Sequence, residues 1–253
     1  MYNTLNVLAQ KKQNNATTKD GNFFCPYLFL SSIIPDSIKR ELEKKFVLCL
    51  LPPFEKLAAP VSCHPDMLIF KSGEHIIMHS DYYCKNSGIF AVHKNRVILS
   101  HEGICDRYPG DVLFNALLMD DTLISRTEST SRLILERHAD RVNVSQGYTA
   151  CSCVKVSESA LITADRGIAL SARERGISVL LIRPGYITLE GYSYGFIGGA
   201  SFSLNDSVYF FGDLDSHPDA HSIRAFISKH KKRTVILGAE HPLSDFGGAV
   251  TLL

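Results

Sequence analysis

The hydrophobic and polar positions of the chain repeat one short pattern four times. Residues 66–81, 111–128, 151–166 and 199–215 each contain an apolar run, a polar turn and a second apolar run. Gly73, Asp120 and Asn205 lie in three of these turns, and Gly, Asp and Asn favour the backbone conformations of tight turns. The pattern therefore predicts four β-hairpins.

A helix and a short β-rich run follow three of the hairpins. Helices are predicted over 129–138, 167–175 and 218–230, because each stretch begins with a capping residue or a proline in the first turn. The apolar runs 142–144, 179–182 and 235–237 come next. The unit is therefore ββαβ, repeated roughly every 45 residues, a spacing typical of repeat architectures. Residues 82–95 are irregular, and no helix is predicted there.

The two ends of the chain together form a fifth unit. Residues 27–51 contain a strand, a helix over 35–45 and a closing strand, but no first strand, whereas residues 248–253 form a first strand without a partner. Pairing them removes two exposed strand edges. We therefore expect one α/β domain over 1–253, with units 22–60 plus 247–253, 61–105, 106–147, 148–190 and 191–246. Residues 11–21 are expected to form a solvated loop.

Composition narrows the classes of partner. Lys and Arg number 27 and Asp and Glu 26, so a net charge of +1 offers no field that would attract nucleic acid or an anionic membrane. The longest apolar run, 46–53, is far shorter than the ~20 residues of a membrane span. Seven cysteines without a secretory signal indicate a reducing, cytoplasmic location. No motif for a nucleotide, another cofactor or a metal ion is present.

Several short motifs resemble one known fold family. Residues 108–113, followed by 121–127, are similar to the Glu-Gly-Gly-Asp-Val box and the later Arg-Thr-Ser run of the pentein, or guanidino-group-modifying enzyme, family. Segments 64–66, 195–198 and 247–252 occur in the order of that family's Arg-Asp, His-x-Asp and Gly-Gly elements. The resemblance implies a five-fold pseudo-symmetric α/β-propeller with an axial pocket, like that of arginine deiminases, agmatine deiminases and amidinotransferases.

Most of the catalytic residues of these enzymes are absent from the matching positions of this chain. In these enzymes two carboxylates hold a guanidinium, a cysteine thiolate attacks its carbon and a histidine transfers protons. Here Phe196 stands at the histidine position, Tyr108 replaces the glutamate, and the C-terminal Gly-Gly segment contains no cysteine. The chain thus resembles a bacterial-type branch lacking the usual catalytic Cys and His, which suggests a pseudoenzyme.

The positions just before each first strand are the candidate site residues, because in a pentein they face the axial pocket. Asp66 and Asp111 are candidate ligand-binding acids, with Tyr108 and Cys63 nearby. An alternative gives these aspartates a structural role as caps at the start of a strand.

Cys151 is a candidate nucleophile with His64 as its base. The competing interpretation places Cys151 and Cys153 two apart on one strand, facing the same way as small buried apolar residues.

Two functions follow. The first is a binding protein whose axial pocket holds a small guanidinium or amine ligand, or whose face meets a protein partner, and which does not deiminate arginine or agmatine. The alternative is a cysteine-dependent hydrolase or transferase that acts on an amidine or amide at a rearranged site. The sequence leaves open whether the protein is an enzyme, which ligand or partner it binds, and its oligomeric state.

Overall fold

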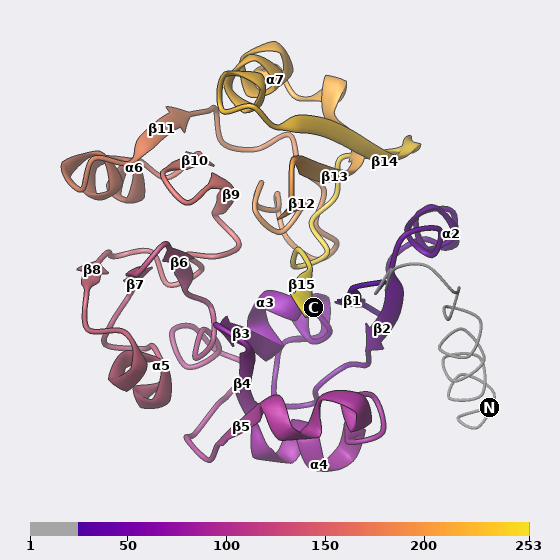
Figure 1. The fold of residues 1–253 in the computed structure, drawn as a ribbon, viewed down its shortest axis with the longest axis vertical. Helices are drawn as coiled ribbons and strands as arrows, with labels where there is room; N and C mark the ends of the chain where they lie inside the picture. The colour runs from indigo at the N-terminus through magenta and orange to yellow at the C-terminus, as the bar shows by residue number, and fades with distance from the viewer. Residues whose placement is uncertain (1–24, 253) are drawn as a thin grey trace, which may run out of the picture.

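The computed structural model describes residues 25–252, which form five three-stranded sheets placed one after another around the middle of the molecule (Figure 1). The sheets contain, in turn, β15 (Val250–Leu252), β1 (Tyr27–Ser31) and β2 (Val47–Leu51); β3 (Ile69–Ser72), β4 (His75–His79) and β5 (Val97–Ser100); β6 (Leu117–Met119), β7 (Thr122–Ser125) and β8 (Arg141–Asn143); β9 (Cys153–Ser157), β10 (Ala160–Thr163) and β11 (Ser178–Leu181); and β12 (Ser201–Leu204), β13 (Ser207–Asp213) and β14 (Arg233–Pro242).

Helical segments connect the second and third strands of the sheets. They are α2 (Asp36–Leu42), α4 (Ser80–Asn86), α5 (Arg132–Arg137), α6 (Arg166–Glu174) and α7 (Ala220–Lys229), while α3 (Pro65–Leu68) precedes β3. Shorter 3₁₀ turns cover Ala59–Val61, Ala91–Arg96 and Leu214–Ser216. None of the helices within residues 25–252 has the length and apolar character needed to cross a membrane.

Each sheet has the same topology. Its middle strand pairs antiparallel with the first strand and parallel with the third. The hairpin turns have the predicted chemistry, since Gly73, Asp120 and Asn205 all have positive φ angles, of 58°, 52° and 53°. The ββαβ unit read from the sequence is therefore present in all five sheets, giving a mixed α/β fold of several small sheets.

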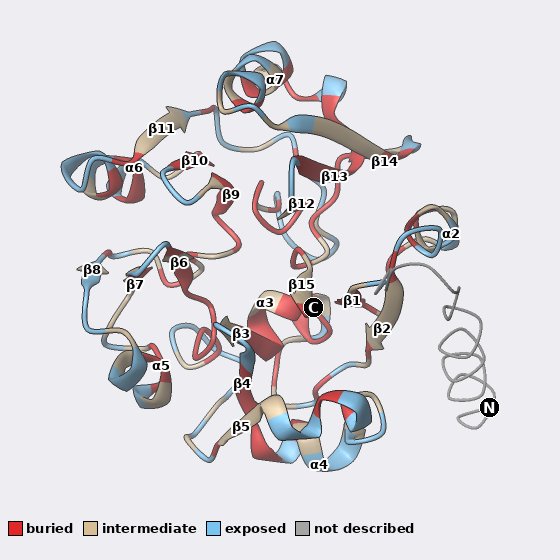
Figure 2. Cartoon of the chain, viewed as in Figure 1, coloured by how far each residue is buried: buried red, intermediate tan, exposed pale blue. Residues whose placement is uncertain are grey.

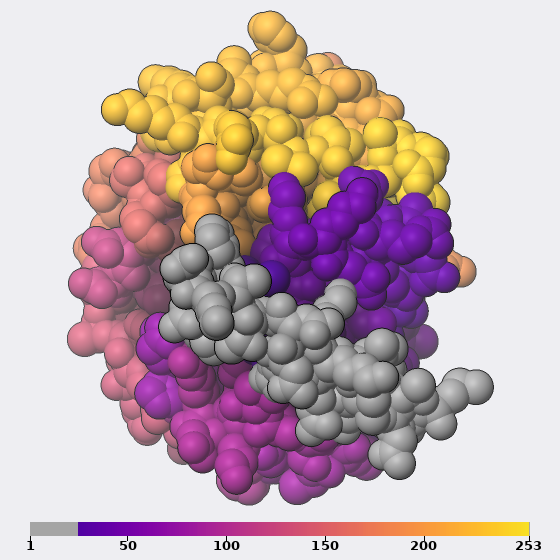
Figure 3. Space-filling model, turned by 45° about the vertical axis from the view of Figure 1, so that its right-hand side comes forward, coloured from indigo at the N-terminus to yellow at the C-terminus, as the bar shows by residue number. Residues whose placement is uncertain are grey.

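The chain ends meet as predicted. β15 runs antiparallel to β1, with Leu252 opposite Tyr27 and Val250 opposite Phe29. In Figure 3 the indigo N-terminal segment packs directly against the yellow C-terminal one, and the backbone N–H of Gly238 donates to Oε1 of Glu41. The solvated loop predicted at 11–21, the first residues of the unit 22–60 and Leu253 lie outside the described residues.

The predicted starts of the first strands are wrong. β3, β6, β9 and β12 begin at residues 69, 117, 153 and 201, one to five residues later than the starts at 67, 112, 152 and 200 that the pattern suggested. Asp66 therefore lies in α3, and Cys151 precedes β9 instead of sharing a strand with Cys153. The two cysteines consequently pack in different apolar clusters, Cys151 near Met67 and Cys153 near Leu161.

The helix α4 was also missed. It begins just before residues 82–95, the stretch that gave no helical pattern, and extends into it, and the Nδ1 atom of His79 accepts a hydrogen bond from the backbone N–H of Asp81 at its start. Histidine is not among the preferred N-cap residues, so the usual sequence signal was lacking.

The core is divided among the units. All residues of β1 and β10 are buried, as are the first six of β13, while the third strands are only half-buried or exposed for most of their length. Figure 2 shows that the buried residues concentrate on the inner strands and on the segments that approach the middle of the molecule. The segments before the first strands are thus held among packed apolar side chains, away from solvent.

Candidate functional site

Three segments that precede first strands meet in the interior. The backbone N–H of Asp66 in α3 donates to the carbonyl of Gly247, just before β15, at 3.2 Å. Cys151, before β9, donates from Sγ to Oδ2 of Asp66 at 2.8 Å. The equivalence of these positions in the repeats thus brings together residues that are far apart in the sequence.

Asn115 fixes the sulfur of Cys151. Its Nδ2 donates to Sγ of Cys151 at 2.9 Å, and its Oδ1 accepts the backbone N–H groups of Ala150 and Cys151 at 2.8 and 3.3 Å. Burial, followed by the negative charge of Asp66, raises the pKa of the Cys151 thiol well above its ordinary value. The thiol is therefore protonated at neutral pH and acts as a hydrogen-bond donor.

His64 faces Asp245 in the same region. Nδ1 of His64 lies 3.7 Å from Oδ1 of Asp245, and neither ring nitrogen of this buried histidine has a hydrogen-bond partner among the described residues. Burial lowers the pKa of His64, and the charge of Asp245 opposes this only in part. Within residues 25–252, His64 hydrogen-bonds to neither Cys151 nor another nucleophile. The structure therefore lacks, in its described part, the hydrogen bond between a thiol and a histidine base that a cysteine nucleophile would need.

Asp245 also fixes two loops. Its Oδ2 accepts the backbone N–H of Phe196 at 2.8 Å, and its Oδ1 accepts that of Gly247 at 2.9 Å. A Cβ atom at Gly199 would lie 1.9 Å from Oδ1 of Asp245, and one at Gly247, where φ is +76°, would lie 2.3 Å from Cβ of His64. Glycine is therefore required at both positions for the loops to approach the buried acid and histidine.

The carboxyl groups of Asp66 and Asp245 influence each other. Burial, together with the negative charge of Asp245, raises the pKa of Asp66 to about 7, and burial raises that of Asp245. Asp66 is half-buried as a residue, but its Oδ1 is shielded from solvent and has no hydrogen-bond partner among the described residues. One acceptor atom of this acid is thus left for another group.

Asp111 has a similar environment in the next unit. It is buried, and its Oδ2 accepts a hydrogen bond from the Tyr148 hydroxyl at 2.5 Å, while Oδ1 has no partner in the described part of the chain. Burial raises the pKa of Asp111, and the hydrogen bond from Tyr148 opposes that shift. The ring of Tyr148 packs between those of Tyr108 and Phe196, at centroid distances of 5.4 and 6.0 Å.

The remaining candidates have other partners. Tyr108 accepts a hydrogen bond from the guanidinium of Arg126 at 2.7 Å and is half-exposed. Cys63 is buried in the core and accepts a hydrogen bond from Oγ of Ser31 at 3.0 Å. Cys63 is thus engaged within the apolar interior, whereas Tyr108 forms the outer end of the aromatic row.

The buried acids have no lysine or arginine partner in the described part of the chain. Within residues 25–252, no lysine or arginine forms an ion pair with Asp66, Asp111 or Asp245. Over the same residues, no group of three or more His, Cys, Asp or Glu is placed to hold a metal ion. What the arrangement offers is carboxylate oxygens in a poorly solvated environment.

Two of the residues that organise this region were missed by sequence reasoning. Asp245 stands two residues before the Gly247-Gly248 pair, which was recognised, and an acid beside paired glycines is the signal that could have drawn attention to it. Asn115 lies inside an apolar run with no comparable signal.

Comparison with protein families gives a match over most of the chain. The model described as "Family of unknown function (DUF6873)" matches residues 29–250. The chain belongs to this family. A comparison with curated proteins gives no match.

Solved structures similar to this DUF6873 protein are enzymes of the pentein fold. Dimethylarginine dimethylaminohydrolase from Pseudomonas aeruginosa, in a complex with citrulline, has a TM-score of 0.54 and 12% identity over 86% of this chain and 94% of that one. The adduct of dimethylarginine dimethylaminohydrolase with S-methyl-L-thiocitrulline gives a TM-score of 0.51 and 11% identity over 85% and 92%. ArgZ, an arginine dihydrolase of cyanobacteria, gives 0.50 and 10% over 85% of this chain and 37% of its own. At these identities the likeness establishes the fold.

Proposed function

We propose that this chain is a pentein-type, five-fold pseudo-symmetric propeller whose axial pocket binds a small cation carrying a guanidinium or amine group. Asp66 and Asp111 would hold that group. The observation that carries the proposal is that Oδ1 of each of these two acids is shielded from solvent and unpartnered among the described residues, with no lysine or arginine paired to either carboxylate. An isolated buried carboxylate is costly, and a bound cation offsets that cost.

The surroundings of both acids suit such a ligand. Asp245 adds a further buried carboxyl whose charge disfavours ionisation of Asp66, so a cation nearby would relieve the repulsion. Tyr108 and Tyr148 stack beside Asp111, and aromatic faces attract guanidinium and ammonium groups. The enzymes with a similar fold act on dimethylarginine and arginine, as their names state, which is consistent with a guanidino ligand.

Binding is proposed in preference to deimination because of the state of the thiol. A nucleophilic cysteine reacts as the thiolate, whereas the pKa of Cys151 is raised by burial and by Asp66. His64 lies beside Asp245, and Phe196 stands where the sequence resemblance would place the family's histidine. The free cysteines suit a reducing cytoplasm, which is the compartment we propose.

Calorimetry with agmatine, arginine and citrulline, whose ureido side chain carries no charge, tests the proposal. We expect a cation to bind and citrulline to bind at least about tenfold more weakly, since a tenfold change corresponds to about 1.4 kcal/mol. Asp66→Asn and Asp111→Asn should each weaken cation binding by a similar factor, whereas Asp121→Asn, at an exposed hairpin turn, is the matched control and should have no effect.

Two results would contradict the proposal. One is unchanged cation affinity in both the Asp66→Asn and Asp111→Asn proteins. The other is formation of a ureido product from arginine or agmatine at a rate abolished by Cys151→Ala, which would favour the cysteine-dependent alternative.

A further inference from the structure

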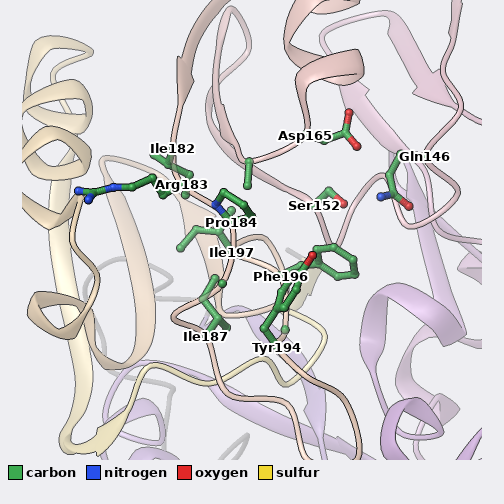
Figure 4. A pocket seen from close by; sticks show the side chains of 13 residues that line it. Gln146, Ser152, Asp165, Ile182, Arg183, Pro184, Ile187, Tyr194, Phe196 and Ile197 are labelled. Atoms are coloured by element: carbon green, nitrogen blue, oxygen red, sulfur yellow. The ribbon is translucent and has the colours of Figure 1, made fainter.

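A cavity lies outside the cluster of buried acids. It has a volume of about 100 Å³ and is formed by the start of α6, the chain just after β11 and the loop 194–197 (Figure 4). Neither Asp66 nor Asp111 lines it, and neither does Cys151. Phe196 lies in its wall and also stacks on Tyr148, so this ring stands between the cavity and the aromatic row beside Asp111.

One end of the cavity is apolar and the other is polar. Ile182, Pro184, Ile187 and Ile197 gather on one side in Figure 4, with the ring of Tyr194 below. The opposite side carries the polar side chains Gln146, Ser152 and Asp165. A ligand that fits both ends has a short apolar body and one polar head.

Ser152 is a buried residue of the cavity lining whose hydroxyl lacks a partner within residues 25–252. The residue is 3% exposed, and its Oγ has no hydrogen-bond partner among the described residues. Its backbone is satisfied, because its N–H donates to the carbonyl of Tyr148 and its carbonyl accepts from Thr163 Oγ1. Buried hydroxyls are normally hydrogen-bonded, so the free Oγ indicates a missing partner inside the cavity.

Asp165 supplies a negative charge at the same end. Its Oδ1 accepts the backbone N–H of Ile168 at 2.8 Å and so caps α6, while the carboxylate forms no ion pair within residues 25–252. Arg183, the one cationic side chain among the described residues that line the cavity, is bound to Asp219 by hydrogen bonds of 2.7 and 3.1 Å and points away from the polar end in Figure 4. The polar end of the cavity, where the polar head of a ligand would lie, therefore carries a negative charge.

We propose that this cavity binds a short primary amine with a branched aliphatic body. The ammonium group donates to Asp165 and to Oγ of Ser152, and the aliphatic part contacts the isoleucines and Pro184. An apolar cavity of about 150 Å³ accommodates benzene, so about 100 Å³ suits an aliphatic group of four or five carbons better than an aromatic ring. An ammonium forms charge-assisted hydrogen bonds with a carboxylate, which an alcohol of the same shape does not.

Ligand-detected NMR titration of the full chain with 3-methylbutylamine tests this site, and 3-methylbutanol is the uncharged isostere. We expect the amine to bind at least tenfold more tightly than the alcohol. Asp165→Asn keeps an oxygen to cap α6 but removes the charge, and should weaken amine binding at least tenfold. Ser152→Ala, which removes only the unpartnered hydroxyl, should weaken it several-fold without loss of folding.

The acids of the proposed axial pocket provide the control that separates the two sites. Asp111→Asn should leave 3-methylbutylamine binding unchanged, and Asp165→Asn should leave arginine binding unchanged. Equal binding of the amine and the alcohol would overturn the amine site, as would amine binding that survives Asp165→Asn or is lost in Asp111→Asn. Failure of agmatine to bind would contradict the axial proposal alone.

Discussion

Burial without a counter-charge is the property shared by the acidic groups of Asp66, Asp111 and Asp245. Each has at least one acceptor satisfied by the protein itself, by a thiol, a tyrosine hydroxyl or backbone N–H groups. None is neutralised by a lysine or arginine within the described residues. At the scale of single residues, the protein therefore stores unfavourable electrostatic free energy that protonation or a bound cation releases.

The pH dependence of stability should reveal Asp66. Its pKa is raised to about 7 in the folded protein and lies near 3.9 when unfolded, so between these values the folded state binds more protons. Stability contributed by the protonated carboxyl is therefore present at low pH and is lost as pH rises through about 7. A shift of this size corresponds to roughly 4 kcal/mol at most, and partial exposure of Asp66 reduces our expectation to about 2 kcal/mol.

Urea unfolding of the native protein and of Asp66→Asn at pH 5 and pH 8 measures this effect. We expect the variant to be more stable than the native protein at pH 8 and to lose most of that advantage at pH 5. The comparison within each pH removes the opposite contribution of His64, whose lowered pKa favours the unfolded state in acid. A stability difference that is the same at both pH values would show that Asp66 is ionised normally.

Asn115 should be a structural requirement of the region around Cys151. Removing its side chain in Asn115→Ala leaves the backbone N–H groups of Ala150 and Cys151 without their acceptor in the interior. We expect a loss of about 2–3 kcal/mol in the free energy of unfolding. Asn143→Ala is the matched control, because the Asn143 side chain also accepts two hydrogen bonds, from Thr127, but is exposed; it should cost less than about 1 kcal/mol. Equal losses in the two variants would argue against a special role for Asn115.

At the scale of helices and strands, the features that depend on local residue types could be predicted from the sequence. The hairpin turns were predictable because Asp120 and Asn205 are types that tolerate positive φ, and α7 was predictable from Pro218 and its apolar spacing. The starts of the first strands were not, because the apolar residues after Asp111 are buried in a loop and resemble a strand in the sequence. Burial of irregular backbone depends on tertiary contacts that the sequence pattern does not display.

The turn between β12 and β13 provides a test at this scale. Asn205 has φ of 53°, which costs a β-branched residue about 1–2 kcal/mol and costs glycine nothing. Asn205→Val should therefore lower the free energy of unfolding by that amount, while Asn205→Gly should leave it nearly unchanged. Chemical denaturation of both variants is the measurement. If valine and glycine are tolerated equally, the turn does not have the conformation described.

At the scale of the whole molecule, the repeat explains why the pairing of the chain ends was predictable and why the contacts of Asp245 were not. The pairing of β15 with β1 followed from an incomplete unit at each chain end. Asp245 was not predicted as part of the site, because its contacts with His64 and Phe196 arise only when loops of different units meet in the interior. Equivalent positions in a repeat predict which segments approach one another, but not which side chains form the contacts between them.

Removal of residues 249–253 should destabilise the whole molecule. The truncation deletes β15, leaves the backbone groups of β1 unpaired on that side and removes Leu252, which is 1% exposed.

Leu252→Ala alone should cost about 2–4 kcal/mol, and the truncation more, out of the roughly 5–15 kcal/mol typical of a folded domain. Thr251→Ala, on the same strand but only half-buried, is the control and should cost less than about 1 kcal/mol. Because β1 packs with residues of the neighbouring unit, such as Phe29 with Phe90, we expect one cooperative transition at a lower temperature in calorimetry. A truncated protein that melts at the native temperature would show that the pairing of the chain ends contributes nothing to the stability of the fold.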